Sequence, residues 1–79
     1  MNKDHTKLSP GLGTFRFGSI AVYRKYVTLE QVQRALAQQV EDNIYRKPHR
    51  RLGDILRDNG WITEEQIASI LKEMGVEQE

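Results

Sequence analysis

The sequence predicts an all-α domain of four helices, in the order short-long-short-long, built from two tandem helix-turn-helix units. The first observation is an internal repeat, because residues 51–74 align without a gap onto residues 16–39 at an offset of 35. The second is that each copy carries a Thr-x-x-Gln helix start followed by apolar residues at helical spacing. Either unit alone leaves its apolar stripe uncovered. We therefore expect the two units to pack face to face with approximate two-fold symmetry, without a sheet.

The repeat extends beyond the matches that two amphipathic helices give by chance. Seven of the 24 aligned positions are identical and four more are similar in kind. An Arg-apolar-Gly opening and a Thr-x-x-Gln start rarely coincide in one register by accident. One supersecondary unit is therefore used twice, and we name residues 16–39 the first unit and residues 51–74 the second unit. The identical pairs are Arg16/Arg51, Gly18/Gly53, Ile20/Ile55, Thr28/Thr63, Glu30/Glu65, Gln31/Gln66 and Leu36/Leu71.

The first unit is predicted to hold a short helix at 19–24 and a long helix at 29–45. Residues 1–15 mix charges with Pro and Gly and are expected to form a mobile tail. Thr28 and Gln31 fit a capping box at the start of the long helix, and Pro48 follows its end. The helical stripe of this helix consists of Leu29, Val32, Ala35, Leu36, Val40 and Ile44.

The second unit repeats this pattern. Gly60 stands where a left-handed residue ends the short helix, Thr63 and Gln66 form the second capping box, and Gly75 ends the last helix. Residues 16–75 should then form one domain, and residues 76–79 a frayed end. The residues predicted to be buried are Leu52, Ile55 and Leu56 in the short helix, and Ile67, Ile70, Leu71 and Met74 in the last helix.

Composition favours a small cytoplasmic domain. The 79 residues include no Cys, no signal-peptide pattern and no apolar run long enough for a membrane span, so we expect no membrane insertion. Charge is divided between the halves: residues 16–51 carry eight Lys/Arg and three Asp/Glu (+5), and residues 52–79 carry two and seven (−5). A basic half can attract an anion, although the two halves can equally attract each other.

The sequence does not support an enzyme. His5 and His49 lie in the predicted tail and linker, without a partner at metal-ligand spacing. The serines lack the strand-turn-helix context of a nucleophile elbow, and no phosphate-binding P-loop is present. Glu64 and Glu65 fall in the first helical turn, where carboxylates favour the helix dipole. We expect neither a catalytic residue nor a bound metal or cofactor.

The Arg-apolar-Gly opening of each unit is the best candidate for binding. Glycine allows close backbone approach, and free N–H groups at a helix start attract phosphate. The adjacent Arg can hold a phosphate or a guanine edge bidentately. In the alternative, Arg16 and Arg51 pair with acids such as Glu41 or Asp54, and the glycines serve helix packing. Two alternatives stay open for the basic residues of the linker, which are either solvated or form an anion-binding rim: Arg46, Lys47, Arg50 and Arg51. Two also stay open for the aromatic pair Tyr26 and Trp61, which either brace the turns or stack on a purine.

The segment RLGDILRDNGWITEEQIASIL resembles the N-terminal domain of type II secretion and type IV pilus assembly ATPases. The MshEN-type subset of that family carries two such motifs and binds the bacterial second messenger cyclic di-GMP. The resemblance does not include an ATPase core, so it implies no ATP hydrolysis. Each family motif opens with Arg-Leu-Gly and closes with Leu-x-x-x-Leu-x-x-Gln. Here Met74 stands in place of the second closing Gln, and the spacer between the motifs is short. The ligand contacts that the resemblance implies are Arg16, Phe17, Gly18 and Gln39 in the first unit, and Arg51, Leu52 and Gly53 in the second.

Three functions follow as hypotheses. The first is a regulatory module that binds cyclic di-GMP. The second is a protein-docking adaptor of the same fold with a degenerate nucleotide site, whose partner would be a secretion or pilus machinery protein. The third, a helix-turn-helix DNA binder, is disfavoured because the last helix carries Glu64, Glu65 and Glu73 against only Lys72, the wrong sign for phosphate contact.

Overall fold

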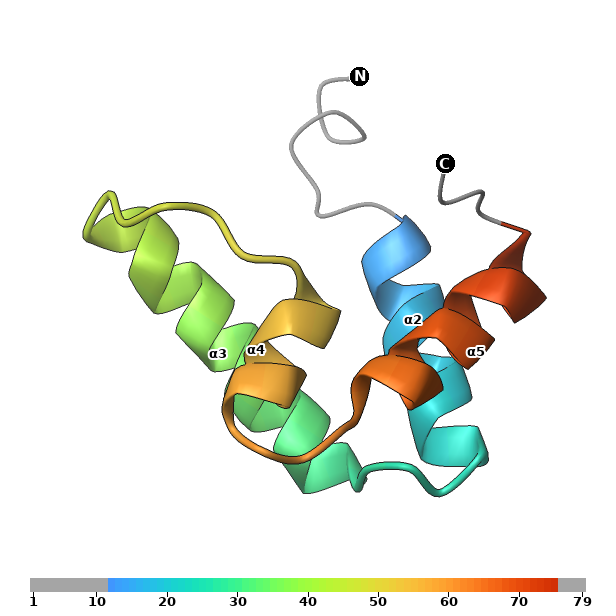
Figure 1. Cartoon of the computed structure of the whole chain (residues 1–79). Helices are drawn as coiled ribbons and strands as arrows, with labels where there is room; N and C mark the ends of the chain where they lie inside the picture. Colours follow the sequence, from blue (N-terminus) through green and yellow to red (C-terminus); the bar gives the residue numbers. More distant parts are fainter. Residues whose placement is uncertain (1–11, 76–79) are drawn as a thin grey trace, which may run out of the picture.

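The computed structural model describes residues 12–75, which form four α-helices and no strand. The all-α prediction with four helices is therefore confirmed. Figure 1 shows α4 in front of α3 and α5 in front of α2, with a connection between α3 and α4 that runs back along α3. Within residues 12–75 no helix has the length and apolar character that crossing a membrane requires. The helices are α2 (Leu12–Tyr23), α3 (Leu29–Ile44), α4 (Leu52–Asp58) and α5 (Glu64–Met74).

Helix α2 begins earlier than the sequence predicted. Residues 12–15, which we assigned to the tail, form its first turn, whereas the rest of that tail lies outside the described residues, as do residues 76–79. Gly13 suggested a break, but a helical glycine costs only about 1 kcal/mol relative to Ala. Tertiary packing of the same helix outweighs that cost, because Phe17 and Ala21 are buried. As a result, the Arg16-Phe17-Gly18 segment lies within α2 and not at a helix start.

The turn after the first helix of each unit has the same backbone geometry. Lys25 and Gly60, which are 35 positions apart, both have positive φ, at 64° and 79°. The residue after each donates its backbone N–H to the carbonyl five residues earlier, at 2.9 Å in both turns. Gly60 adopts this conformation at no steric cost, whereas a left-handed Lys costs about 1–2 kcal/mol. The predicted left-handed end at Gly60 is confirmed.

Both predicted capping boxes are present. The backbone N–H of Gln31 donates to the Thr28 hydroxyl at 3.1 Å, and the Thr28 N–H donates to the Gln31 side-chain oxygen at 3.0 Å. Thr63 and Gln66 repeat both bonds at the same distances. Gly75 ends α5 in the left-handed conformation, with φ 79°. These local signals fix where α3 and α5 begin.

The core is shared between the two units. Helix α3 packs mainly against α4, and α2 packs against α5 and α4, so each helix contacts a helix of the other unit. Face-to-face packing of the units requires such contacts, and the approximate two-fold symmetry stays a prediction. The buried apolar residues are Phe17, Ala21, Val27, Val32, Ala35, Leu52, Ile55, Leu56, Ile62 and Ile70.

Candidate functional site

The two Arg-apolar-Gly segments meet in the core. A methyl group placed on Gly53 would lie 3.0 Å from Cζ of Phe17, and one placed on Gly18 would lie 3.4 Å from Cδ2 of Leu52. The apolar residue of each segment thus sits over the glycine of the other, and all four residues are buried. This contact supplies the packing role that was the alternative explanation of the glycines. Ligand contact by these four residues stays a prediction.

The two arginines of these segments point outward. The Arg51 side chain is 82% exposed, and its Nε lies 3.8 Å from Asp54. The same carboxylate accepts the Arg51 backbone N–H at 3.2 Å. Asp54 therefore occupies the start of α4, where we predicted a phosphate. Arg16 is exposed and forms no ion pair within residues 12–75.

Gln39 supports the linker between the units. Its Nε2 donates to the backbone carbonyl of Arg50 at 3.1 Å. The Arg50 guanidinium donates to Asp42 at 3.0 and 3.2 Å and to Asp58 at 3.0 Å. Asp42 is the one buried charged residue among residues 12–75. The sequence left Arg50 either solvated or in an anion-binding rim, and neither alternative included a pairing with Asp42. The signal for that pairing is that Asp42 follows the buried Ala35 by seven residues, on the core-facing side of α3.

The contacts of Arg50 shift two pKa values, its own and that of Asp58. The hydrogen bonds that Arg50 donates to Asp42, and then the one that it donates to Asp58, raise the pKa of Arg50. In return, the hydrogen bond from Arg50 lowers the pKa of Asp58, with a smaller contribution from Arg57. Both shifts favour the charged forms, the guanidinium of Arg50 and the carboxylate of Asp58.

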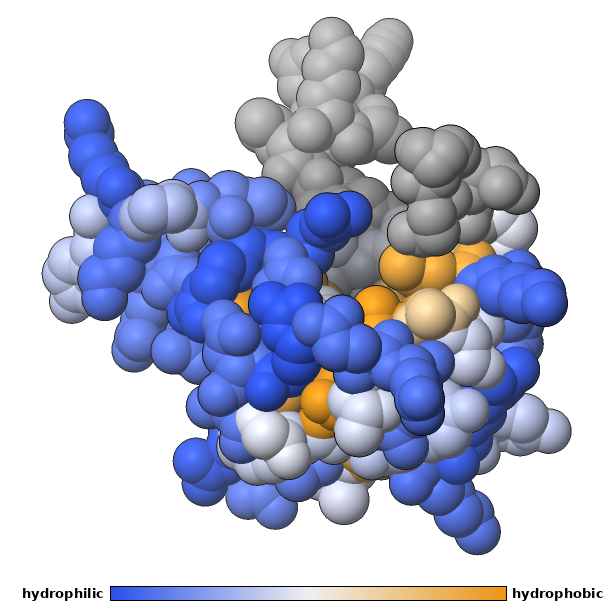
Figure 2. All heavy atoms as spheres, viewed as in Figure 1, coloured by the Kyte–Doolittle hydropathy of each residue, from blue (hydrophilic) through white to orange (hydrophobic). Residues whose placement is uncertain are grey.

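A groove of about 480 Å³, which we name the second-unit groove, lies between α4, α5 and the start of α2. It brings together four of the seven predicted site residues and Met74, whereas Arg16, Gly18 and Gln39 do not line it. Figure 2 shows apolar surface between α4 and α5 with hydrophilic side chains around it. The groove is lined by Gly13, Phe17, Leu52, Gly53, Ile67, Leu71 and Met74 together with the polar residues Thr14, His49, Arg51, Asp54, Arg57 and Glu64.

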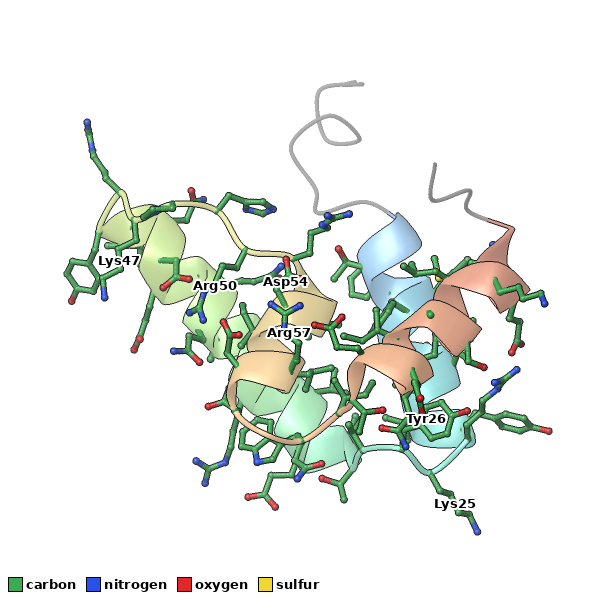
Figure 3. All side chains as sticks on the ribbon, viewed as in Figure 1. Lys25, Tyr26, Lys47, Arg50, Asp54 and Arg57 are labelled. Atoms are coloured by element: carbon green, nitrogen blue, oxygen red, sulfur yellow. The ribbon has the colours of Figure 1, made fainter. Side chains whose placement is uncertain are left out.

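Ion pairs neutralise the rim of the second-unit groove. Arg57 lies 3.3 Å from Glu64, 3.7 Å from Asp54 and 3.4 Å from Asp58. Figure 3 shows Asp54, Arg57 and Arg50 close together beside α4. Intramolecular carboxylates therefore already surround the positive charge of Arg57, and a dianionic ligand would have to compete with them.

A second groove of about 540 Å³, the first-unit groove, lies between α2 and α3. Among residues 12–75, no charged residue lines it. Three of its apolar side chains are largely exposed: Phe15 at 57%, Tyr23 at 85% and Leu29 at 60%. The sequence analysis expected Leu29 in the buried stripe, which is wrong because no described element covers this side of α3. The groove is lined by Thr14, Phe15, Gly18, Ser19, Val22, Tyr23, Leu29, Val32, Gln33 and Leu36.

The two grooves occupy matching positions of the repeat and differ in character. At an offset of 35, five uncharged residues of the first-unit groove match charged residues later in the chain, and three of those charged residues, Asp54, Arg57 and Glu64, line the second-unit groove. The second-unit residues are joined by ion pairs, whereas four of the five first-unit residues are apolar or aromatic. The pairs are Arg50/Phe15, Asp54/Ser19, Arg57/Val22, Asp58/Tyr23 and Glu64/Leu29.

A further polar cluster joins the turn of the first unit to α5. Arg24 donates to the Ser69 hydroxyl at 2.7 Å and to the Tyr26 hydroxyl at 3.2 Å, and it pairs with Glu73. The hydrogen bond with Arg24 lowers the pKa of Tyr26, and the hydrogen bond with Tyr26 raises that of Arg24. Tyr26 and Trp61 both pack against the core, which favours the bracing interpretation of these aromatics.

The described residues 12–75 contain no cluster of His, Cys, Asp and Glu suited to a metal ion. Comparison of the chain with family models, curated proteins and solved structures gave no match.

Proposed function

We propose that the chain is a non-catalytic docking module whose first-unit groove binds a segment of another protein. One observation carries this proposal: the repeat places ion-paired charges around the second-unit groove and apolar residues at the matching positions of the first. The second unit serves as an internal reference, because it shows that the fold accommodates charges at these positions. Fold stability therefore does not account for the exposed apolar residues of the first unit.

The exposed groove has the character of an interface. Burying apolar surface contributes roughly 25 cal/mol per Å², and contiguous apolar patches on soluble proteins commonly mark interaction sites. Phe15 and Tyr23 are aromatic and largely exposed, and aromatic residues are enriched at interfaces. A groove between two helices suits an amphipathic helix laid along it. On the resemblance given above, the partner would be a component of a secretion or pilus machine.

Site-specific crosslinking tests this proposal with a matched control. A photoreactive amino acid at Ser19 would sit in the first-unit groove, and one at Asp54 would sit at the matching position of the second-unit groove. We expect a crosslinked partner protein from position 19 and little from position 54. Equal yields at the two positions, or no product at either, would refute docking through the first-unit groove.

Cyclic di-GMP binding is the second candidate, and one observation favours it. The second-unit groove gathers Phe17, Arg51, Leu52 and Gly53, with Met74 at the position of the closing Gln. Calorimetric titration with cyclic di-GMP, with GMP as the control, tests this candidate. If the nucleotide binds, Arg51→Ala should weaken its affinity about tenfold or more through loss of a charge-assisted contact. The absence of binding at tens of micromolar would reject the candidate and leave the docking proposal unaffected.

A further inference from the structure

We infer that the docked segment is an amphipathic helix of about four turns with carboxylates near both of its ends, and that it lies along α3. This inference rests on the proposed docking function and specifies the chemistry of the partner. It follows from two features of α3 and the residues that flank it: the length of an exposed apolar stripe on α3 and the charges at the two ends of that stripe.

The apolar stripe on α3 extends well beyond the first-unit groove. Leu29, Leu36, Val40 and Ile44 lie at i, i+7, i+11 and i+15, which places them on one helical face. Leu29 is 60% exposed, Val40 59% and Ile44 66%. A helix of 16 residues is about 24 Å long, so covering the whole stripe requires a partner helix of about four turns.

The end of α3 has no counterpart in the second unit. Helix α5 ends at Met74, which matches Gln39, whereas α3 continues to Ile44. The extra residues add Val40 and Ile44 to the exposed stripe and contribute neither of them to the core. The extension therefore lengthens the exposed apolar surface and adds no apolar residue to the core, and its one buried residue is Asp42, which pairs with Arg50.

Unpaired cations stand at both ends of the stripe. Lys25 precedes the start of α3, and Arg46 and Lys47 follow its end. None of the three forms an ion pair within the part of the chain that the structure describes. Figure 3 shows Lys25 and Lys47 at opposite extremes of the molecule. A partner with carboxylates at both ends of its apolar face would be complementary to these charges.

A second copy of this chain fits this face less well. In a two-fold contact between α3 helices, antiparallel packing would bring Lys25 against Arg46 and Lys47 of the other copy. Parallel packing would instead bring each cation against itself. Like charges meet in both arrangements, and such contacts oppose association. An acidic helix from another protein therefore fits better than self-association.

Two synthetic peptides provide the test. Both would be helices of about four turns with the same Leu stripe, one with Glu and the other with Lys at the positions beside its ends. We expect the acidic peptide to bind the full chain at least about tenfold more tightly, by fluorescence anisotropy. The difference should shrink in about 1 M salt, where the screening length falls to about 3 Å.

Charge reversal on the protein completes the test. Lys25→Glu/Lys47→Glu should remove or invert the preference for the acidic peptide, whereas Lys72→Glu, an exposed cation on α5, should preserve it. Circular dichroism of each variant verifies that the fold is retained. A preference that is unchanged in the double variant would overturn the inference.

The inference would also be overturned if the two peptides bound with equal affinity or if neither bound. Sedimentation that showed the chain dimerising through the first-unit groove, at the concentrations used for the peptides, would overturn it as well. Tighter binding to phosphatidylserine vesicles than to the acidic peptide would point to a membrane surface and reject the acidic helix. If the acidic preference is absent but crosslinking stays specific to position 19, only this inference fails. If crosslinking is not specific to position 19, the docking proposal itself fails.

Discussion

Phe17 lies directly over Gly53, with its ring atom Cζ 3.0 Å from the position that a Cβ of residue 53 would occupy. Leu52 lies over Gly18 in the reciprocal contact, at 3.4 Å. The Arg-apolar-Gly motif that opens each unit is therefore also where the two units pack against each other. A contact this close favours glycine at position 53, because a methyl group there would push against the aromatic ring of Phe17.

The first prediction concerns this contact. Gly53→Ala should destabilise the domain by about 1–3 kcal/mol, the usual cost of overpacking a core. Gly13→Ala is the matched control: it lies in α2 with open space around it, so it should stabilise by about 0.5–1 kcal/mol. Urea unfolding measures both changes. If Gly53→Ala is as stable as Gly13→Ala, then Phe17 does not pack on Gly53 as described.

The second prediction concerns the cap of α5. Thr63→Ala removes the hydroxyl that accepts the Gln66 backbone N–H at 3.1 Å, and the loss should cost about 1 kcal/mol. Thr63→Ser keeps an acceptor and should restore most of that stability. The midpoint of urea unfolding, measured with the slope of the transition, reports the difference. An alanine variant with the wild-type midpoint would argue against the cap.

The third prediction is a pH dependence that arises from the carboxyl group of Asp58. Arg50 lowers its pKa in the folded protein, so the unfolded chain binds a proton more readily. The resulting stabilisation is present above the ordinary Asp pKa of about 3.9, and it is lost as pH falls through the lower folded value. Thermal unfolding between neutral and acidic pH should show this loss in the wild type and a smaller one in Asp58→Asn. Identical pH profiles would contradict the described contact.

Local signals made much of the fold predictable from sequence. The capping boxes at Thr28 and Thr63 and the left-handed residues Gly60 and Gly75 depend on neighbours within a few positions, so the sequence is sufficient to place them. The start of α2 was missed because Gly13 was weighed without the packing of the same helix.

The burial of individual side chains and the contrast between the two grooves depend on contacts between helices, which the sequence does not show. Leu29 has the spacing of a core residue, yet no described element covers it. The sequence assigned no role to Asp42, and in the structure Arg50 pairs with it at the edge of the core. The contrast between the grooves was present in the sequence as Val22 and Leu29 against Arg57 and Glu64, but its meaning required the structure to place these positions around matching grooves.

The most direct test of the account transfers the charges of the second unit into the first. Val22→Arg/Leu29→Glu places a counterpart of the Arg57–Glu64 pair, whose charged atoms are 3.3 Å apart, in the first-unit groove. We would measure the yield of partner crosslinked from position 19 in this background. The account predicts a fall of about tenfold or more in a variant that circular dichroism shows to be folded, a control that is needed because Val22 also packs against the core. An undiminished yield in a folded variant would contradict docking through this groove.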